Sequence, residues 1–162
     1  MKEIKPIGAF EGEFELPGDK SITHRAVMLN AGAEGEAVVT HALMGGDCLS
    51  TCQCMRALGA RIDIDGTTLC VHGTPRFRTG VRLNCGNSGT TMRLLTGFAA
   101  GKNIEAVLFG DESLSGRPMA RVASPLSLLG ADVRTTEGHA PVCVFPAPLR
   151  GAEIEMSIAS AQ

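Results

Sequence analysis

The chain contains no tryptophan and no tyrosine, and aromatic residues make up only 4% of its 162 residues. Proteins that stack bases or sugars need aromatic side chains, so this composition argues against a stacking platform. The 15 lysines and arginines nearly balance the 17 aspartates and glutamates in short mixed clusters, and the formal net charge is −2. A broad positive surface for nucleic acid is therefore excluded, and we predict no nucleic-acid partner.

Long hydrophobic runs are also missing. The first residues, Met1-Lys2-Glu3-Ile4-Lys5, carry charges where a secretory signal would be apolar. No stretch approaches the roughly 20 apolar residues that cross a bilayer. We therefore predict a cytoplasmic protein with no membrane partner. With 44% hydrophobic residues, the chain is long enough to bury a core as one large domain or two small ones.

Six cysteines are present, but their spacing predicts neither a disulfide framework nor a metal site. A chain of this size with an ample core has no need of disulfides, so reduced thiols are expected. The closest group is Cys48, Cys52 and Cys54, on one expected helix and without a histidine at zinc-ligand spacing. We interpret them as packed thiols, and we expect no metal and no cofactor.

Strand and helix patterns occur in the same order twice. The first series is a strand at 13–16, a helix at 21–33, a strand at 37–43, a helix at 48–58 and a hairpin of 61–64 with 68–71. The second is a strand at 81–84, a helix at 88–100, a strand at 105–109, a helix at 118–129 and strands at 132–135 and 142–145. An Asp65-Gly66 turn closes the first hairpin. These patterns predict an α/β (α+β) fold of repeated βαβαββ units.

The two series also share sequence at the same place. Ala57-Leu58-Gly59-Ala60-Arg61-Ile62-Asp63 resembles Leu128-Leu129-Gly130-Ala131-Asp132-Val133-Arg134. In both, a glycine follows a helix, where a left-handed backbone is needed. This is typical of an internal duplication, with complete units at about 12–73 and 80–146.

A third unit starts at 151–162, with an alternating strand at 152–157, and the sequence stops where its helix should begin. A strand without its helix leaves an apolar face and a backbone edge uncovered. We therefore predict that the chain is part of a longer protein.

Each unit begins with a strand, a small polar turn and a helix. The three turns are Pro17-Gly18-Asp19-Lys20-Ser21, Gly86-Asn87-Ser88-Gly89-Thr90 and Ser160-Ala161-Gln162. Helix N-termini offer free N–H groups and partial positive charge to anions, and Lys20 and Arg25 add full charges. Equivalent ends of packed repeats lie together, so we expect one shared anion site. Each turn by itself is also explained by helix capping, with Asp19 or Ser21 as the first cap.

Two arginines and a proline extend this pattern. Arg117 precedes Pro118, which we place in the first turn of the helix at 118–129, so Arg117 should lie at its open end. Arg93 lies four residues into the helix at 88–100, where it either forms an ion pair behind the site or contacts the ligand. Pro125 should remove a hydrogen bond inside its helix, and no functional reason for it is evident.

In this order, the motifs resemble the N-terminal part of the 5-enolpyruvylshikimate-3-phosphate synthase family, from about residue 4 to the end. The resemblance rests on four motifs: Pro17-Gly18-Asp19-Lys20-Ser21 with Arg25, Gly86-Asn87-Ser88-Gly89-Thr90 with Arg93, Arg117-Pro118-Met119, and Ser160-Ala161-Gln162. It implies βαβαββ units of the enolpyruvyl transferase type in a two-domain enzyme. The implied reaction transfers the enolpyruvyl group of phosphoenolpyruvate to the 5-hydroxyl of shikimate 3-phosphate, with release of phosphate, in the shikimate pathway of aromatic amino acid biosynthesis.

The resemblance also implies residue roles, with Lys20 as the catalytic residue that balances charge as phosphate leaves. The residues implied to hold phosphoenolpyruvate are Lys20, Gly89, Arg117 and Gln162. Those implied to bind shikimate 3-phosphate are Lys20, Ser21, Arg25, Ser160 and Gln162. The family's proton-transferring acidic residues and further cations lie in the C-terminal domain, beyond residue 162. We therefore predict little or no turnover by this chain alone.

Two alternatives stay open. The sister enolpyruvyl transferase that acts on UDP-N-acetylglucosamine shares the repeats, but it usually carries a cysteine in the loop before its Arg-Pro, and residues 110–116 contain none. A non-catalytic phosphate-binding module, or half of a split enzyme, would carry the same half-site. Coding sequence in frame downstream would favour a longer chain, whereas a separate gene for the other half would favour a split enzyme.

Overall fold

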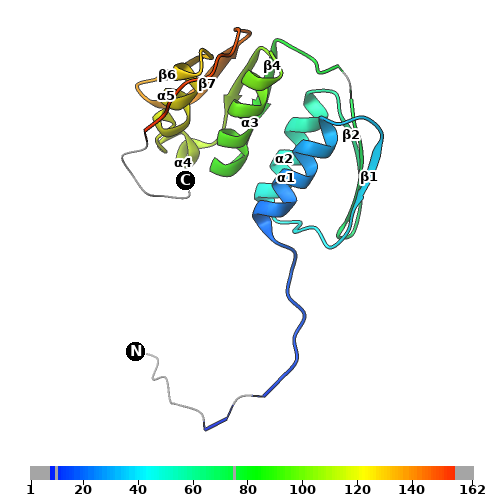
Figure 1. Ribbon diagram of the computed structural model, residues 1–162. Coiled ribbons are helices and arrows are strands. Elements are labelled where there is room, and N and C mark those ends of the chain that lie inside the picture. The colour runs from blue at the N-terminus through cyan, green and yellow to red at the C-terminus, as the bar shows by residue number, and fades with distance from the viewer. Residues whose placement is uncertain (1–7, 10, 75, 156–162) are drawn as a thin grey trace.

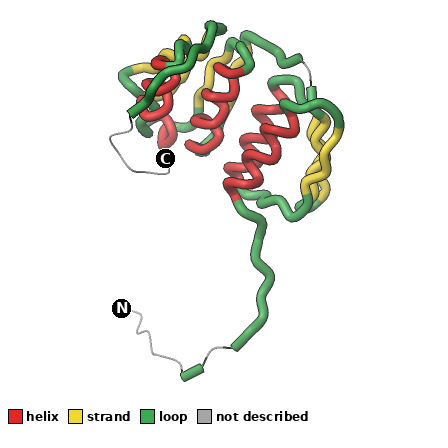
Figure 2. The backbone as a smooth tube through the Cα atoms, viewed as in Figure 1, coloured by secondary structure: helices red, strands yellow, loops and turns green. Residues whose placement is uncertain are grey.

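The structure is a computed structural model that describes residues 8–9, 11–74 and 76–155. The strands form two sheets, each with helices packed against one face (Figures 1 and 2). The helices of the two halves also pack against each other, so they lie between the sheets. Of the helices in the described part of the chain, none has the length and apolar character needed to cross a bilayer.

The first half builds a three-stranded sheet. Its elements are α1 (Lys20–Ala31), β1 (Glu36–Val39), α2 (Gly46–Ala57), β2 (Arg61–Asp65) and β3 (Thr68–His72). The strands are antiparallel in the order β1-β3-β2. The predicted turn is confirmed, because Gly66 takes a φ of 54° and Asp65 pairs with Thr68. The hairpin thus forms where its local sequence requires it.

The second half builds a four-stranded sheet. Its elements are β4 (Val81–Asn84), α3 (Gly89–Gly101), β5 (Ala106–Phe109), α4 (Glu112–Ser115), α5 (Ala120–Leu128), β6 (Asp132–Thr136) and β7 (His139–Phe145). The strand order is β4-β5-β7-β6, with β4 and β5 parallel and the other pairs antiparallel. The order β5-β7-β6 matches β1-β3-β2 of the first sheet, so the halves share this part of their topology.

The predicted strand at 13–16 is wrong. These residues have no regular secondary structure, and Phe14 and Leu16 are 71% and 68% exposed on a segment that leads away from the folded body (Figure 1). The counterpart in the second half, β4, is paired with β5. Backbone N–H and C=O groups of a strand need a partner strand. Among the described residues, none pairs with 13–16, so the alternating pattern forms no strand.

Three boundaries also differ from the sequence prediction. The strand expected at 37–43 ends at Val39, and the left-handed φ of 58° at His41 is incompatible with its continuation. Pro118 precedes Met119, the N-cap of α5, so its expected place in the first helical turn is wrong. Residues 151–155 form no strand, and the rest of the strand expected at 152–157 lies outside the described residues.

Both halves contribute to one hydrophobic core. The fully buried members include Val27, Met55, Leu58, Leu69, Val71, Leu83, Met92, Leu95, Leu108 and Val144. The two glycines expected in a left-handed conformation after helices are confirmed, since Gly59 has a φ of 110° and Gly130 a φ of 90°. Pro125 lies inside α5, as expected. The shared core holds the helix ends in fixed positions, which is what a site built on those ends requires.

Gly97→Ala should raise the free energy of unfolding by about 0.5–1 kcal/mol, because alanine loses less backbone freedom than glycine when a helix forms. Gly97 lies inside α3, and a Cβ added there would meet no atom within 4 Å. Urea unfolding followed by circular dichroism measures the change. A lower stability of the variant would contradict this account of α3.

Candidate functional site

Lys20 lies at the start of α1, directly after its cap. The Ile22 amide donates to Asp19 Oδ1 at 2.7 Å, so Asp19 rather than Ser21 is the N-cap. The side chain of Lys20 is half-exposed, and its Nζ lies 3.2 Å from Asp47 Oδ2 at the start of α2. The ion pair therefore joins the ends of two helices and leaves the ammonium accessible to a second anion.

Gly18 sets the place where α1 begins. A Cβ on this glycine would lie 1.9 Å from the carbonyl oxygen of His41 and 2.8 Å from the amide nitrogen of Leu43. Only glycine permits such close approach of two backbone segments. The Pro-Gly turn therefore holds the chain against the loop after β1, two residues before Lys20.

The start of α3 forms a second corner of the site. Ser88 is its N-cap, and its Oγ accepts from the Thr91 amide at 3.1 Å. Gly89 follows and is buried. A Cβ on Gly89 would lie 2.7 Å from Arg93 Nη1 and 3.3 Å from Arg117 Nη1. Two guanidinium groups thus converge on the first residue of a helix, where the backbone already carries partial positive charge.

Arg117 is held by a chain of hydrogen bonds. Its Nη2 donates to Asn87 Oδ1 at 2.7 Å, and Asn87 Nδ2 donates to Asp111 Oδ2 at 2.8 Å. The hydrogen bond from Asn87, followed by that from the Leu114 amide, holds the pKa of Asp111 below its usual value. The ionised carboxylate therefore fixes Asn87, and Asn87 fixes the guanidinium beside Gly89.

Arg93 has no acidic partner among the described residues. Its Nη2 donates to the Pro118 carbonyl at 3.0 Å, and its buried Nε has no hydrogen-bond partner. Burial, and then the charges of Arg117 and Arg121, lower the pKa of Arg93. The ion pair considered for Arg93 is therefore not found in the described part of the chain. Uncompensated guanidinium charge in a partly buried corner favours an anionic ligand.

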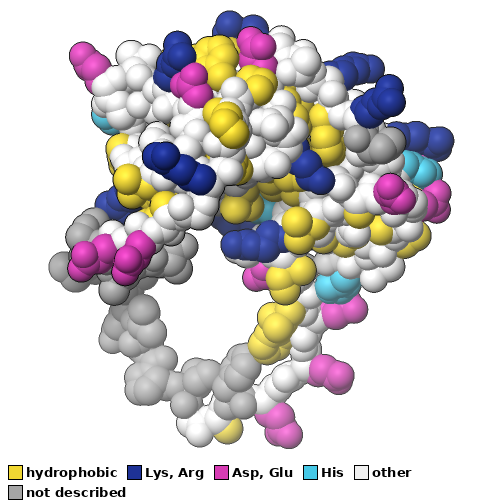
Figure 3. Space-filling model, turned by 45° about the horizontal axis from the view of Figure 1, so that its top comes forward, with side chains coloured by type: hydrophobic (Ala, Val, Ile, Leu, Met, Phe, Trp, Pro, Cys, Tyr) yellow, Lys and Arg dark blue, Asp and Glu magenta, His cyan; other side chains and the backbone are white. Residues whose placement is uncertain are grey.

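Arg93 and Arg117 thus bring two positive charges to one corner. On the face shown in Figure 3, Lys and Arg side chains are interspersed with Asp and Glu side chains. Such a distribution suits a small anion held locally better than a long polyanion.

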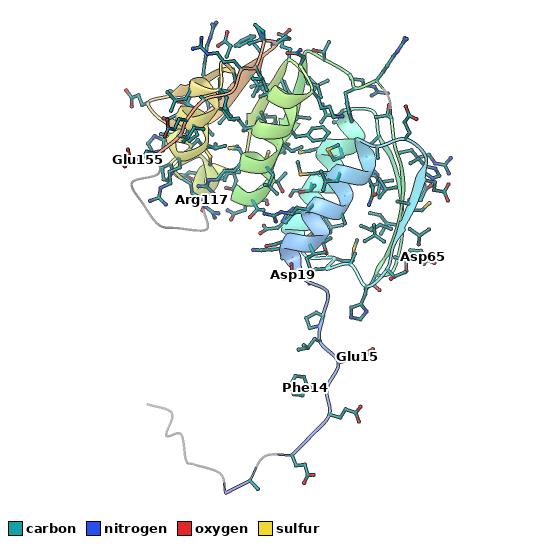
Figure 4. The ribbon with its side chains drawn as sticks, viewed as in Figure 1. Phe14, Glu15, Asp19, Asp65, Arg117 and Glu155 are labelled. Atoms are coloured by element: carbon teal, nitrogen blue, oxygen red, sulfur yellow. The ribbon has the colours of Figure 1, made fainter. Side chains whose placement is uncertain are left out.

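Asp47 connects the two corners. Its carboxylate pairs with Lys20, and its backbone oxygen accepts from Thr91 Oγ1 at 3.1 Å. Figure 4 shows Asp19 and Arg117 at the same end of the helices. The expected convergence of the first two helix starts is therefore seen.

The other predicted site residues divide into two groups. Ser21 and Arg25 are exposed on α1 beside Lys20, and Arg25 Nη1 donates to the Ser21 carbonyl at 3.1 Å. Ser160 and Gln162 lie outside the described residues. The structure therefore brings together the parts of the site that come from the first two units.

A buried polar chain behind the site was missed by the sequence analysis. His24 is fully buried, and its Nδ1 lies 2.7 Å from Thr51 Oγ1. Thr51 Oγ1 is 2.8 Å from Thr91 Oγ1, which is 2.7 Å from Ser88 Oγ. The available signals were weak: His24 lies one turn after Lys20, and Thr91 lies three residues after a cap.

Groups that could hold a metal are few in the described part of the chain. Glu36, Cys70 and His72 have one possible ligand atom each within 4.8 Å of one another on the outer face of the first sheet. However, His72 Nδ1 already lies 3.0 Å from Glu36 and Nε2 lies 3.2 Å from Asp63. We interpret this group as an ion-pair network. The three thiols considered above are buried in α2.

Comparisons with known proteins identify the family of this chain. Residues 4–162 match the family model of EPSP synthase (3-phosphoshikimate 1-carboxyvinyltransferase). Proteins with the name 3-phosphoshikimate 1-carboxyvinyltransferase from Thermoanaerobacter pseudethanolicus and Geobacillus kaustophilus are 45% and 47% identical to this chain. These alignments cover 99% and 96% of this chain but only 38% of each relative.

Comparison with solved structures indicates the same family. The structure of EPSP synthase from Acinetobacter baumannii superimposes with a TM-score of 0.87 at 41% identity, covering 94% of this chain and 36% of that protein. The mixed α/β fold is therefore that of EPSP synthase structures. With the family model matching nearly the whole chain, this chain belongs to the EPSP synthase (3-phosphoshikimate 1-carboxyvinyltransferase) family.

Proposed function

We propose that the protein containing this chain transfers the enolpyruvyl group of phosphoenolpyruvate to the 5-hydroxyl of shikimate 3-phosphate and releases phosphate. The observation that carries this proposal is the convergence of Arg93 and Arg117 on Gly89, without an acidic ion-pair partner among the described residues. Family membership supplies the identity of the anions.

The 5-hydroxyl loses its proton as its oxygen bonds to C2 of phosphoenolpyruvate, and C3 takes up a proton. The bond from C2 to the phosphate oxygen then breaks, and C3 loses a proton so that the C2=C3 double bond is restored. Both substrates are polyanions, so catalysis requires cations and N–H donors that are in place before the substrates arrive. We assign the phosphate of phosphoenolpyruvate to Lys20, Gly89, Arg117 and Gln162. Lys20 is the proposed catalytic residue, since its ammonium balances the charge of the departing phosphate.

Shikimate 3-phosphate is assigned to the neighbouring surface of α1. Arg25 offers the forked donors that suit a planar carboxylate, and Ser21 offers a hydroxyl. Lys20, Ser160 and Gln162 complete the proposed contacts. Support comes from the position of Ser21 and Arg25 beside Lys20 on one exposed helix end.

We further propose that this chain is the N-terminal portion of a two-domain enzyme, with repeat units at about 12–73 and 80–146 and the start of a third at 151–162. The repeated strand order supports the duplication, and the relatives extend well beyond the matched region. The groups for proton transfer are then expected from the other domain, and we expect little or no turnover by this chain alone. The cytoplasmic location remains a prediction from the sequence.

Titration of shikimate 3-phosphate and then phosphoenolpyruvate into the isotope-labelled chain tests the proposal, with backbone amide NMR shifts as the readout. We expect localised shifts at Ser21, Arg25, Gly89 and Arg117. Lys20→Ala should weaken phosphoenolpyruvate binding about tenfold, because a hydrogen bond to a charged group is lost. Lys102→Ala is the matched control, since Lys102 follows the opposite end of α3.

Two other results would contradict parts of this proposal. Shifts with inorganic phosphate but none with shikimate 3-phosphate would favour the phosphate-binding module. Release of phosphate from phosphoenolpyruvate when the purified chain is mixed with both substrates, if abolished by Lys20→Ala, would contradict the expected lack of turnover.

A further inference from the structure

We propose that His24 is a positioning residue for the anion site, acting through Thr51 and Thr91 on both corners of the site. The inference rests on the proposed function, since it concerns the same site. His24 itself is fully buried, so it touches no substrate.

The hydrogen-bonded series of buried side chains that starts at His24 crosses three helices. His24 belongs to α1, Thr51 to α2 and Thr91 to α3, and all three residues are 0% exposed. The distances from His24 Nδ1 to Thr51 Oγ1 and on to Thr91 Oγ1 are 2.7 and 2.8 Å. These hydrogen bonds are directional, whereas apolar side chains of the same volume would hold the helices together without fixing their relative rotation and height.

This hydrogen-bonded series reaches both corners of the site through Thr91. Thr91 Oγ1 is hydrogen-bonded to Ser88 Oγ at 2.7 Å, directly before Gly89. It is also hydrogen-bonded to the Asp47 backbone oxygen at 3.1 Å, and Asp47 pairs with Lys20. A displacement of Thr91 would therefore move the N–H groups at the start of α3 and the anchor of the Lys20 ammonium together.

The two ring nitrogens of His24 have different surroundings, and this determines which of them carries the proton. Its Nε2 is buried and has no hydrogen-bond partner among the described residues. Orphaned buried N–H groups are rarer than orphaned acceptors. We therefore place the proton on Nδ1, from which it is donated to Thr51, and leave Nε2 as a bare acceptor. The useful group of His24 is then a single N–H donor at the Nδ1 position.

This orientation yields a test with two conservative variants. The amide nitrogen of asparagine lies near the position of Nδ1, whereas that of glutamine reaches the position of Nε2. His24→Asn should retain the affinity for phosphoenolpyruvate, in the presence of shikimate 3-phosphate, within about twofold, and His24→Gln should weaken it about tenfold or more. NMR titration of the Ser88, Gly89 and Thr90 amides measures both affinities, and urea unfolding shows whether both variants fold.

A second pair of variants serves if His24→Gln does not fold. Thr91→Ser keeps the hydroxyl and should bind like the unchanged chain, whereas the isosteric Thr91→Val removes it and should bind about tenfold more weakly. Equal affinities within both pairs would overturn the inference while leaving the proposed function intact. Absence of binding by the unchanged chain would overturn the proposed function and this inference with it.

Discussion

Gly18→Ala should lower the free energy of unfolding by about 1–3 kcal/mol and weaken the proposed binding of phosphoenolpyruvate about tenfold. The added Cβ would lie 1.9 Å from the His41 carbonyl oxygen and 2.8 Å from the Leu43 amide nitrogen. Both are backbone atoms, so no side-chain rotation relieves the contact. Either the segment before α1 or the loop after β1 must move. Lys20 follows two residues later and moves away from Asp47 and the start of α3.

Two measurements on the same samples check this expectation. Urea unfolding followed by circular dichroism reports the stability, and amide shifts during titration report the affinity. Gly12→Ala is the matched control, because Gly12 lies in the same irregular segment and a Cβ there meets no atom within 4 Å. Unchanged binding by the Gly18 variant would show that the place where α1 begins does not control Lys20.

Acidification should destabilise the chain through His24 before the carboxylates titrate. Burial is the main cause that lowers the pKa of His24 from its ordinary value of 6.5; Asp47 opposes the shift, and Lys20 and Arg25 add to it. Below pH 6.5 the unfolded chain binds a proton that the folded chain does not. Stability is therefore fully present above the ordinary pKa and is lost as the pH falls towards the lower pKa of the folded state. The slope reaches ~1.4 kcal/mol per pH unit.

Urea unfolding at several pH values between about 4.5 and 7.5 measures this slope, a range that covers the ordinary pKa of histidine. His24→Asn should remove most of it, because the variant has no titrating ring at the buried position. His139→Asn should keep it, since His139 lies on β7 and is not fully buried. The lowered pKa values of Asp63 and Asp111 affect stability only in more acidic solution. Identical slopes with and without His24 would contradict the assignment of this pH dependence of stability to His24.

Most of the helices and turns follow from local sequence. Asp19 and Ser88 cap helices because their side chains accept from amides three residues later. Gly59, Gly66 and Gly130 adopt positive φ where turns and helix ends require it. These features depend on contacts within a few residues, so the sequence pattern carries the necessary information.

The sequence pattern was less successful where a distant partner strand, a very short helix or a single left-handed residue decides the structure. Residues 13–16 have the alternation of a strand, yet no described strand pairs with them. The short helix α4 was missed, although the Leu114 amide donates to Asp111 Oδ1 at 2.8 Å, because a single capped turn has no apolar periodicity. The strand predicted at 37–43 is too long, because β1 ends at Val39 and the left-handed His41 prevents its continuation.

The sequence by itself determined that helices begin near Ser21 and Ser88, one residue from the observed starts at Lys20 and Gly89, that cations lie close to those starts, and that the motifs are those of one family. It could do so because capping, turn formation and motif order are local properties. Only the tertiary structure decided that Asp47 lies between the two helix starts, that Arg93 and Arg117 converge on Gly89, and that a buried chain from His24 supports them. The physical reason is that these contacts join residues far apart in sequence, and packing of the shared core sets their distances.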